Sequence, residues 1–272
     1  GPVLLDPGPY STFETLAAGI ERLGWRVVDV ENVLLTHIHF DHAGAAWKFA
    51  EHGATIFLNP IGIPHLKNPE KLWNSAKQIY QDKMDSLWGE MKPIKEESLV
   101  GLADGQSVEF GNAIFETFYT PGHAVHHNVY KLEEVFFTGD VAGVKIENGP
   151  VVPPCPPPDI NIELWKKTIE RLREIKAKGI YQTHYGYHDD VENLFRQLEV
   201  ELDKWANYIQ PMYEDQKPTE DITPVFVDTI QSFYRSKGLD EEQIQAYELA
   251  NPSWMSVGGL LRYWRLKEQG RL

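Results

Sequence analysis

Four side chains that can bind a metal ion, three of them imidazoles, lie within the six residues from His37 to His42. With 10 His in 272 residues, three at these fixed offsets would occur by chance about 0.01 times along the chain. The segment follows Val33-Leu34-Leu35-Thr36, an apolar run that predicts a buried strand. The chain is therefore expected to fold so that one strand ends in a metal site.

The spacing of these ligands predicts two ions. In an extended segment, side chains at positions i and i+2 share a face, so His37 and His39 can converge on one ion. The turn that follows directs Asp41 and His42 elsewhere, and a second ion is implied.

Strands and helices alternate around this segment. Val3–Leu5 predicts a short strand, and helices are expected from about Thr12 to Leu23 and from Ala43 to His52. Residues 54–58 predict a further strand, 107–140 are strand-rich with turns at 111–112 and 133–134, and 180–183 predict a last strand after a helix over 159–178. This alternation is typical of a layered α/β domain.

A helix-rich insert at about 60–98 interrupts the pattern, and the chain is helical after Asp189. We therefore predict a main domain at 1–199 and a helical C-terminal region at 200–272. The large apolar residues of the insert recur in steps of +7, +4, +4 and +3, which places them on one helical face: Trp73, Tyr80, Met84, Trp88 and Met91. Core or dimer packing is favoured for this stripe, and a lid or substrate wall that includes Trp88 is the alternative.

Charge and cysteine content restrict the class of partner. A net charge of −14 repels polyanions and counts against a nucleic-acid substrate. The chain has neither the run of about 20 apolar residues that crosses a bilayer nor a secretory signal pattern. Cys155 is the only cysteine, so no intrachain disulfide is possible. These features predict a cytoplasmic protein that binds neither nucleic acid nor membranes.

Three further residues are placed as His37 is, after apolar or β-branched runs. They are His123, Asp140 and His184, found in Thr120-Pro121-Gly122-His123, Phe136-Phe137-Thr138-Gly139-Asp140 and Tyr181-Gln182-Thr183-His184. Ligands at strand ends can meet at one edge of a sheet, so these are the best candidates to complete two sites.

The whole set resembles the metallo-β-lactamase superfamily, whose signature is a clustered His-x-His-x-Asp-His followed by a separate His, Asp and His. The resemblance runs from Leu4 to about His188 and implies a four-layered αβ/βα sandwich, here with the helical C-terminal appendage. It implies that His37, His39 and His123 hold one ion, that Asp41, His42 and His184 hold the other, and that Asp140 bridges both. A hydroxide between the ions would be the nucleophile, oriented by Asp41.

Zinc is favoured by imidazole-rich ligation, and iron or manganese is compatible with it. Within the superfamily the chain resembles the glyoxalase-II-like (hydroxyacylglutathione hydrolase-like) branch, which implies hydrolysis of a small thioester, ester or lactone. Three alternatives stay open at this point: a mononuclear-iron oxygenase resembling persulfide dioxygenase, a phosphodiesterase or nuclease, and a non-catalytic metal-binding module.

Side chains near the ligands are candidates for substrate contacts. His126 and His127 closely follow His123 and can orient a ligand or touch substrate, while Tyr185 follows His184 and can donate to an oxyanion. Superfamily members usually begin with a β-hairpin that is not evident before Val3, and Gly1-Pro2 is compatible with a cleavage scar. A strand edge left open by a missing hairpin would favour a homodimer.

Overall fold

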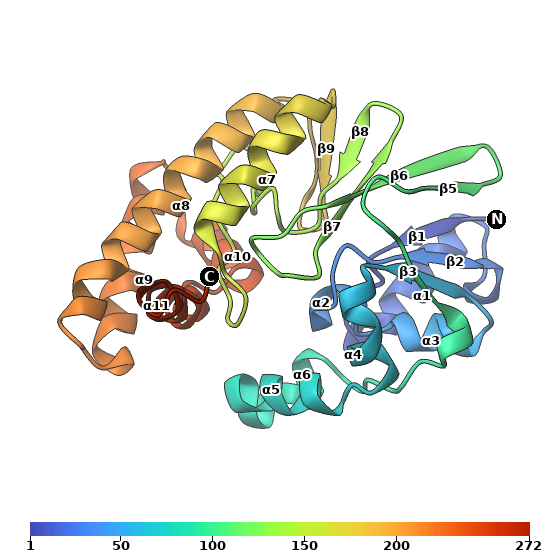
Figure 1. The fold of residues 1–272 in the computed structure, drawn as a ribbon, viewed down its shortest axis with the longest axis horizontal. Helices are drawn as coiled ribbons and strands as arrows, with labels where there is room; N and C mark the ends of the chain where they lie inside the picture. Colours follow the sequence, from blue (N-terminus) through green and yellow to red (C-terminus); the bar gives the residue numbers. More distant parts are fainter. The chain divides into compact units, whose positions relative to one another are not determined.

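The computed structural model describes residues 1–272, which form two compact units. Unit 1 comprises residues 1–119 and 126–133, and unit 2 comprises residues 120–125 and 134–272. Helices and strands occur in both units (Figure 1), and the predicted α/β class is confirmed.

The first sheet lies entirely within unit 1 and is parallel. Its order is β1-β2-β3-β4, and the strands are β1 (Val3–Leu5), β2 (Asn32–Leu34), β3 (Thr55–Leu58) and β4 (Leu99–Gly101). Between β1 and β2 lie η1 (Tyr10–Thr12), α1 (Phe13–Arg22) and η2 (Val27–Asp29). Val33 of β2 and Ile56 of β3 are fully buried in the core of this unit, as expected for central parallel strands.

The segment after β2 differs from the single helix predicted over 43–52. Two helices are present, α2 (Phe40–Ala43) and α3 (Ala46–Glu51), and the first begins three residues earlier than predicted. The turn between them passes very close to neighbouring backbone, since a Cβ on Gly44 would lie 2.4 Å from the Phe40 carbonyl oxygen and 3.0 Å from Pro9 Cα. The early start places Asp41 and His42 on the first turn of α2.

The insert also contains more separate helices than the spacing of its apolar residues suggested. It consists of η3 (Pro60–Gly62), α4 (Ile63–Lys67), α5 (Glu70–Tyr80), η4 (Gln81–Lys83), α6 (Met84–Leu87) and η5 (Glu96–Ser98). The predicted stripe does not lie on one helix as its spacing indicated, because α5 ends at Tyr80 and Gln81 adopts a positive φ of 51°. The aromatic and Met side chains nevertheless pack together around Phe40 and Met84.

An antiparallel ladder completes unit 1. Its strands are β5 (Ser107–Phe110), β6 (Ala113–Tyr119) and β7 (Asn128–Leu132), with β6 paired to both neighbours. The turn predicted at 111–112 joins β5 to β6, and Gly111 takes the positive φ of 62° that such a turn needs.

Unit 2 combines three strands with five helices. Strand β8 (Val135–Phe137) pairs in parallel with β9 (Gly179–Gln182), which pairs antiparallel with β10 (Gly186–His188). Its helices are α7 (Ile162–Ile175), α8 (Val191–Glu214), α9 (Thr219–Ser236), α10 (Glu241–Ala250) and α11 (Ser253–Glu268).

Helix α7 begins where Asn161 caps the Leu164 N–H and ends at Ile175, before the predicted Lys178, because Lys176 has a φ of 64°. The predicted helical C-terminal region is confirmed. The division at 199/200 stays a prediction, and α8 spans that point. None of the helices combines the length and apolar character that crossing a bilayer would require.

Candidate metal centre

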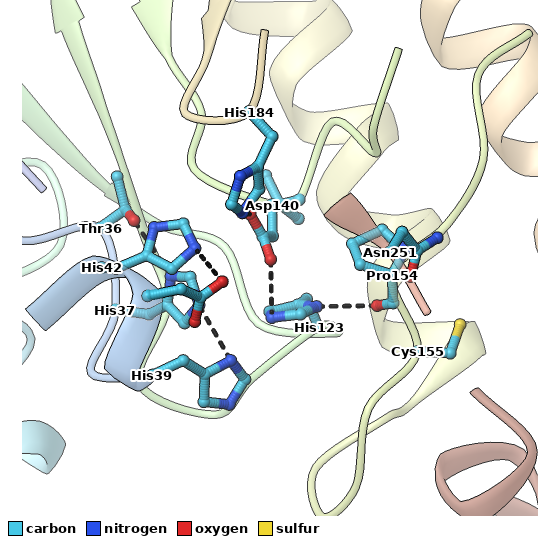
Figure 2. A network of polar contacts seen from close by, with 12 residues as sticks. Thr36, His37, His39, His42, His123, Asp140, Pro154, Cys155, His184 and Asn251 are labelled. Atoms are coloured by element: carbon cyan, nitrogen blue, oxygen red, sulfur yellow. Dashed lines mark hydrogen bonds and ion pairs between the residues drawn. The ribbon is translucent and has the colours of Figure 1, made fainter. Parts of the chain in front are cut away.

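The predicted ligands of unit 1 follow directly from the end of β2. His37 and His42 are buried, and their ring centroids lie 3.9 Å apart. The Nε2 atom of His37 lies 3.0 Å from Nδ1 of His39 (Figure 2). Two imidazole nitrogens at this separation can share a proton or a metal ion, so this part of the chain concentrates ligand atoms as the sequence predicted.

Asp6 orients two of these imidazoles and was missed from the sequence. Its carboxylate accepts the Thr36 backbone N–H at 2.8 Å and the Thr36 hydroxyl at 2.7 Å, and it lies 2.8 Å from His42 Nδ1. The Thr36 oxygen in turn lies 3.0 Å from His37 Nδ1. A carboxylate accepts only, and the Thr36 proton is already used, so Nδ1 carries the proton in both rings. The lone pair of each ring is then on Nε2, the nitrogen that can ligate.

Asp41 lies beside the His42 ring and near the insert. Its Oδ2 is 3.4 Å from His42 Nε2, and its side chain is 33% exposed. Burial raises the pKa of the Tyr80 phenol, and the charge of Asp41 raises that pKa further. The Asp41 carboxylate therefore lies close enough to the insert to influence a phenol on α5.

Two of the proposed substrate contacts lie against the ligand rings of unit 1. His126 and His127 stack on His37 with centroid distances of 6.2 and 4.9 Å, and His126 Nδ1 accepts the Ile38 N–H at 3.4 Å. Both are buried, His127 completely. This geometry fits the role of packing and orienting His37, and contact with substrate stays a prediction for both.

The other two proposed contacts differ in setting. Trp88 packs against Phe40 and Tyr80 with centroid distances of 6.0 and 5.0 Å. Tyr185 is 50% exposed in the turn between β9 and β10, where its φ is 77°. Their substrate contacts also stay predictions.

Unit 2 brings together the three predicted ligands that are distant in the sequence. His123 Nε2 lies 3.4 Å from Oδ2 of Asp140, and His184 Nε2 lies 3.5 Å from Oδ1 of the same carboxylate (Figure 2). The His123 Nδ1 donates to the Pro154 carbonyl at 2.9 Å, so this ring also has its lone pair on Nε2. Each oxygen of Asp140 thus faces the Nε2 atom of a different imidazole.

Backbone packing fixes His123. Gly122 has a φ of 140°, and a Cβ there would lie 2.4 Å from both Cα and Cβ of Trp165 on α7. The His123 ring meets the Trp165 ring edge-on at 5.6 Å. Only glycine can precede His123 at this distance from the helix.

The donor set fits a divalent metal. Two ligand atoms about 2.0–2.1 Å from one ion at a tetrahedral angle lie about 3.3–3.4 Å apart. The contacts of His42 with Asp41 and of Asp140 with its two imidazoles span 3.4–3.5 Å. These distances match ligands that share an ion better than charge-assisted hydrogen bonds, which are about 2.7–2.9 Å long. The His and Asp groups therefore imply a divalent metal cofactor.

Comparison with known proteins points in the same direction. The family model "Metallo-beta-lactamase superfamily" matches residues 1–184. The chain is 28% identical over 161 residues to the "Metallo-beta-lactamase fold-containing protein ST1585" of Sulfurisphaera tokodaii, covering 58% of this chain and 61% of that protein. It is 25% identical over 177 residues to the "Atrochrysone carboxyl ACP thioesterase" of Aspergillus fumigatus, covering 64% and 44%.

A solved structure supports the fold over nearly the whole chain. The metallo-beta-lactamase family protein TTHA1429 from Thermus thermophilus superposes with a TM-score of 0.67 at 19% identity, covering 98% of this chain and 84% of that one. By contrast, the chain spans about half the length of the curated relatives named above, 61% and 44%.

Proposed function

Because the chain belongs to the metallo-beta-lactamase superfamily, we propose that it is a metal-dependent hydrolase of small thioester, ester or lactone substrates. One of its relatives is named a thioesterase, which supports the thioester as the first bond to test. The glyoxalase-II-like branch and zinc as the native metal are parts of this proposal.

We assign the ligands to two ions. As the resemblance to the superfamily implies, His37, His39 and His123 are assigned to the first ion, and Asp41, His42 and His184 are assigned to the second. Asp140 is assigned to both ions because its two oxygens face different imidazoles. When bound, the ions would polarise a carbonyl group and bring the pKa of a bound water near 7.

The protein residues have separate roles in this proposal. Asp41 orients the attacking water, since its carboxylate is partly exposed beside the His42 ring. Asp6 and Thr36 hold His42 and His37 in the ligating tautomer, and the Pro154 carbonyl does the same for His123.

One observation favours this proposal over the alternative functions. Three predicted imidazole ligands each present Nδ1 to an oxygen that accepts its proton, so each has its lone pair on Nε2. A solvated or core histidine has no need of this shared arrangement, whereas a metal ligand depends on it.

The test is a hydrolysis assay on protein loaded with zinc, manganese or iron, using thioesters, lactones, aryl esters and β-lactams. We expect turnover of at least one of the first three classes and its loss in His37→Ala. His52→Ala removes an exposed histidine away from the predicted ligands and is the matched control. Turnover no higher than that of His37→Ala on every substrate would refute the proposal. One iron per chain with oxygen uptake would show an oxygenase instead.

A further inference from the structure

The insert of unit 1 contains an open cavity that the metal ligands do not line. Its volume is about 600 Å³, within the usual size range of sites for small molecules. Apolar groups on its wall include Trp73, Met91, Pro69 and Pro93. Such a wall suits the apolar body of an organic ligand better than a hydrated metal ion, which prefers oxygen ligands throughout.

Two carboxylates on the same wall have no cationic partner in the protein. Glu70 lies on the first turn of α5 and Asp85 on α6, and neither forms an ion pair. The third carboxylate of the wall, Glu90, differs because Lys92 lies 3.3 Å from it. The ammonium of Lys92 also lies 4.3 Å from the centroid of the Trp47 ring, and neither residue lines the cavity. The cavity therefore offers two uncompensated negative charges to an occupant.

The wall of the cavity also contains an aromatic ring, that of Trp73. A tryptophan ring attracts an ammonium group placed over its face, and carboxylates nearby strengthen the attraction. Trp73 also contacts Phe40 edge-on, with centroids 5.8 Å apart. Phe40 separates the predicted ligands His39 and Asp41 in the sequence, so an occupant touching Trp73 would lie one side chain away from that segment.

We infer that this cavity binds a small organic cation, an ammonium group carried on an apolar body. Glu70 and Asp85 balance its charge, Trp73 contacts the ammonium group, and the proline and methionine side chains cover the apolar part. The inference concerns a site separate from the metal ligands and does not depend on the reaction catalysed there.

The test is calorimetric titration of the zinc-loaded protein, residues 1–272, with benzyltrimethylammonium. We expect saturable binding at one site, about tenfold tighter than for the uncharged 3-phenylpropanol, and no binding of 3-phenylpropionate. Equal affinity for the cation and the alcohol, or no saturable binding of the cation, would overturn the inference.

A pair of charge-matched variants locates the site. Glu70→Gln/Asp85→Asn should weaken binding of benzyltrimethylammonium about tenfold. Asp82→Asn/Glu97→Gln removes the same net charge from exposed positions of the insert outside the cavity and should change the affinity less than twofold. An equal loss in both variants would show that the cation responds to the overall charge of the protein and would reject the site.

Discussion

The two units supply their predicted metal ligands in opposite ways. Unit 1 provides them from a single run of six residues, and a buried side chain, Asp6, orients the cluster. Unit 2 provides them from three segments separated by 17 and 44 residues, and a backbone carbonyl, that of Pro154, orients His123. A side chain that anchors an imidazole by accepting its proton can be removed by one substitution. A backbone carbonyl that anchors an imidazole in the same way is lost only if the chain itself moves.

The largest effect is expected from Asp140→Ala. The two oxygens of this carboxylate face Nε2 of His123 and Nε2 of His184, so its removal should disturb both proposed ions. We expect hydrolysis to fall by about 10³-fold or more and bound metal to fall below one ion per chain. Elemental analysis and steady-state kinetics measure the two quantities.

Two further variants sharpen this prediction. His184→Ala should reduce metal content less than Asp140→Ala, because His184 faces only one of the two carboxylate oxygens. Asp189→Ala, an exposed acid of the same unit, should retain metal and activity. Equal metal loss in the Asp140 and His184 variants would contradict the assignment of Asp140 to both ions.

Gly259→Ala should move the backbone that anchors His123. A Cβ on Gly259 of α11 would lie 2.0 Å from the Cys155 carbonyl oxygen, directly after Pro154. Backbone cannot rotate away from this clash, so we expect the free energy of unfolding to fall by about 3 kcal/mol. Denaturant unfolding followed by circular dichroism measures this loss.

The neighbouring residue is a matched control. A Cβ on Gly258 meets no atom closer than 3.8 Å, so Gly258→Ala should keep or raise stability by up to about 1 kcal/mol through helix propensity. Comparable destabilisation by both variants would mean that α11 does not pack on the 153–158 segment as described.

Asp6→Asn tests the side-chain anchor of unit 1. The amide keeps the size of the carboxylate but weakens the contact that holds His42 Nδ1. We expect metal affinity, measured by chelator competition, to fall about 10-fold to 100-fold. Pro154→Ala retains the carbonyl that His123 needs and should change affinity less than about threefold. If Pro154→Ala were the more damaging variant, the contrast between the two anchors would be wrong.

The same contrast explains what the sequence could and could not predict. The cluster from His37 to His42 was evident because its ligands are local, and strand-end placement suggested His123, Asp140 and His184. Their mutual contacts within unit 2 depend on packing such as that of Gly122 on Trp165, which no local pattern encodes.

Asp6 was missed for a different reason. It follows the apolar strand Val3–Leu5 just as Asp140 follows β8, so the signal was present. An isolated aspartate before Pro-Gly reads equally well as a turn residue, however. The breaks at Gly44 and Gln81 were hidden because helical spacing continues across them, while tertiary contacts and a left-handed backbone interrupt the helices.

The smallest effect concerns Cys155, the single thiol, which is buried in the segment that carries the unit 2 anchor. Burial raises its pKa above the ordinary value of 9.0, so the folded protein keeps the proton while the unfolded chain releases it. This contribution to stability is complete below pH 9 and is lost as pH rises above it.

The unfolding free energy of the wild type should therefore fall by about 1 kcal/mol more than that of Cys155→Ala between pH 8 and pH 10. The many tyrosines and lysines titrate in both proteins and cancel in the difference. Parallel pH curves would mean that the thiol is open to solvent, and the segment holding Pro154 would then be less rigid than the backbone anchor requires.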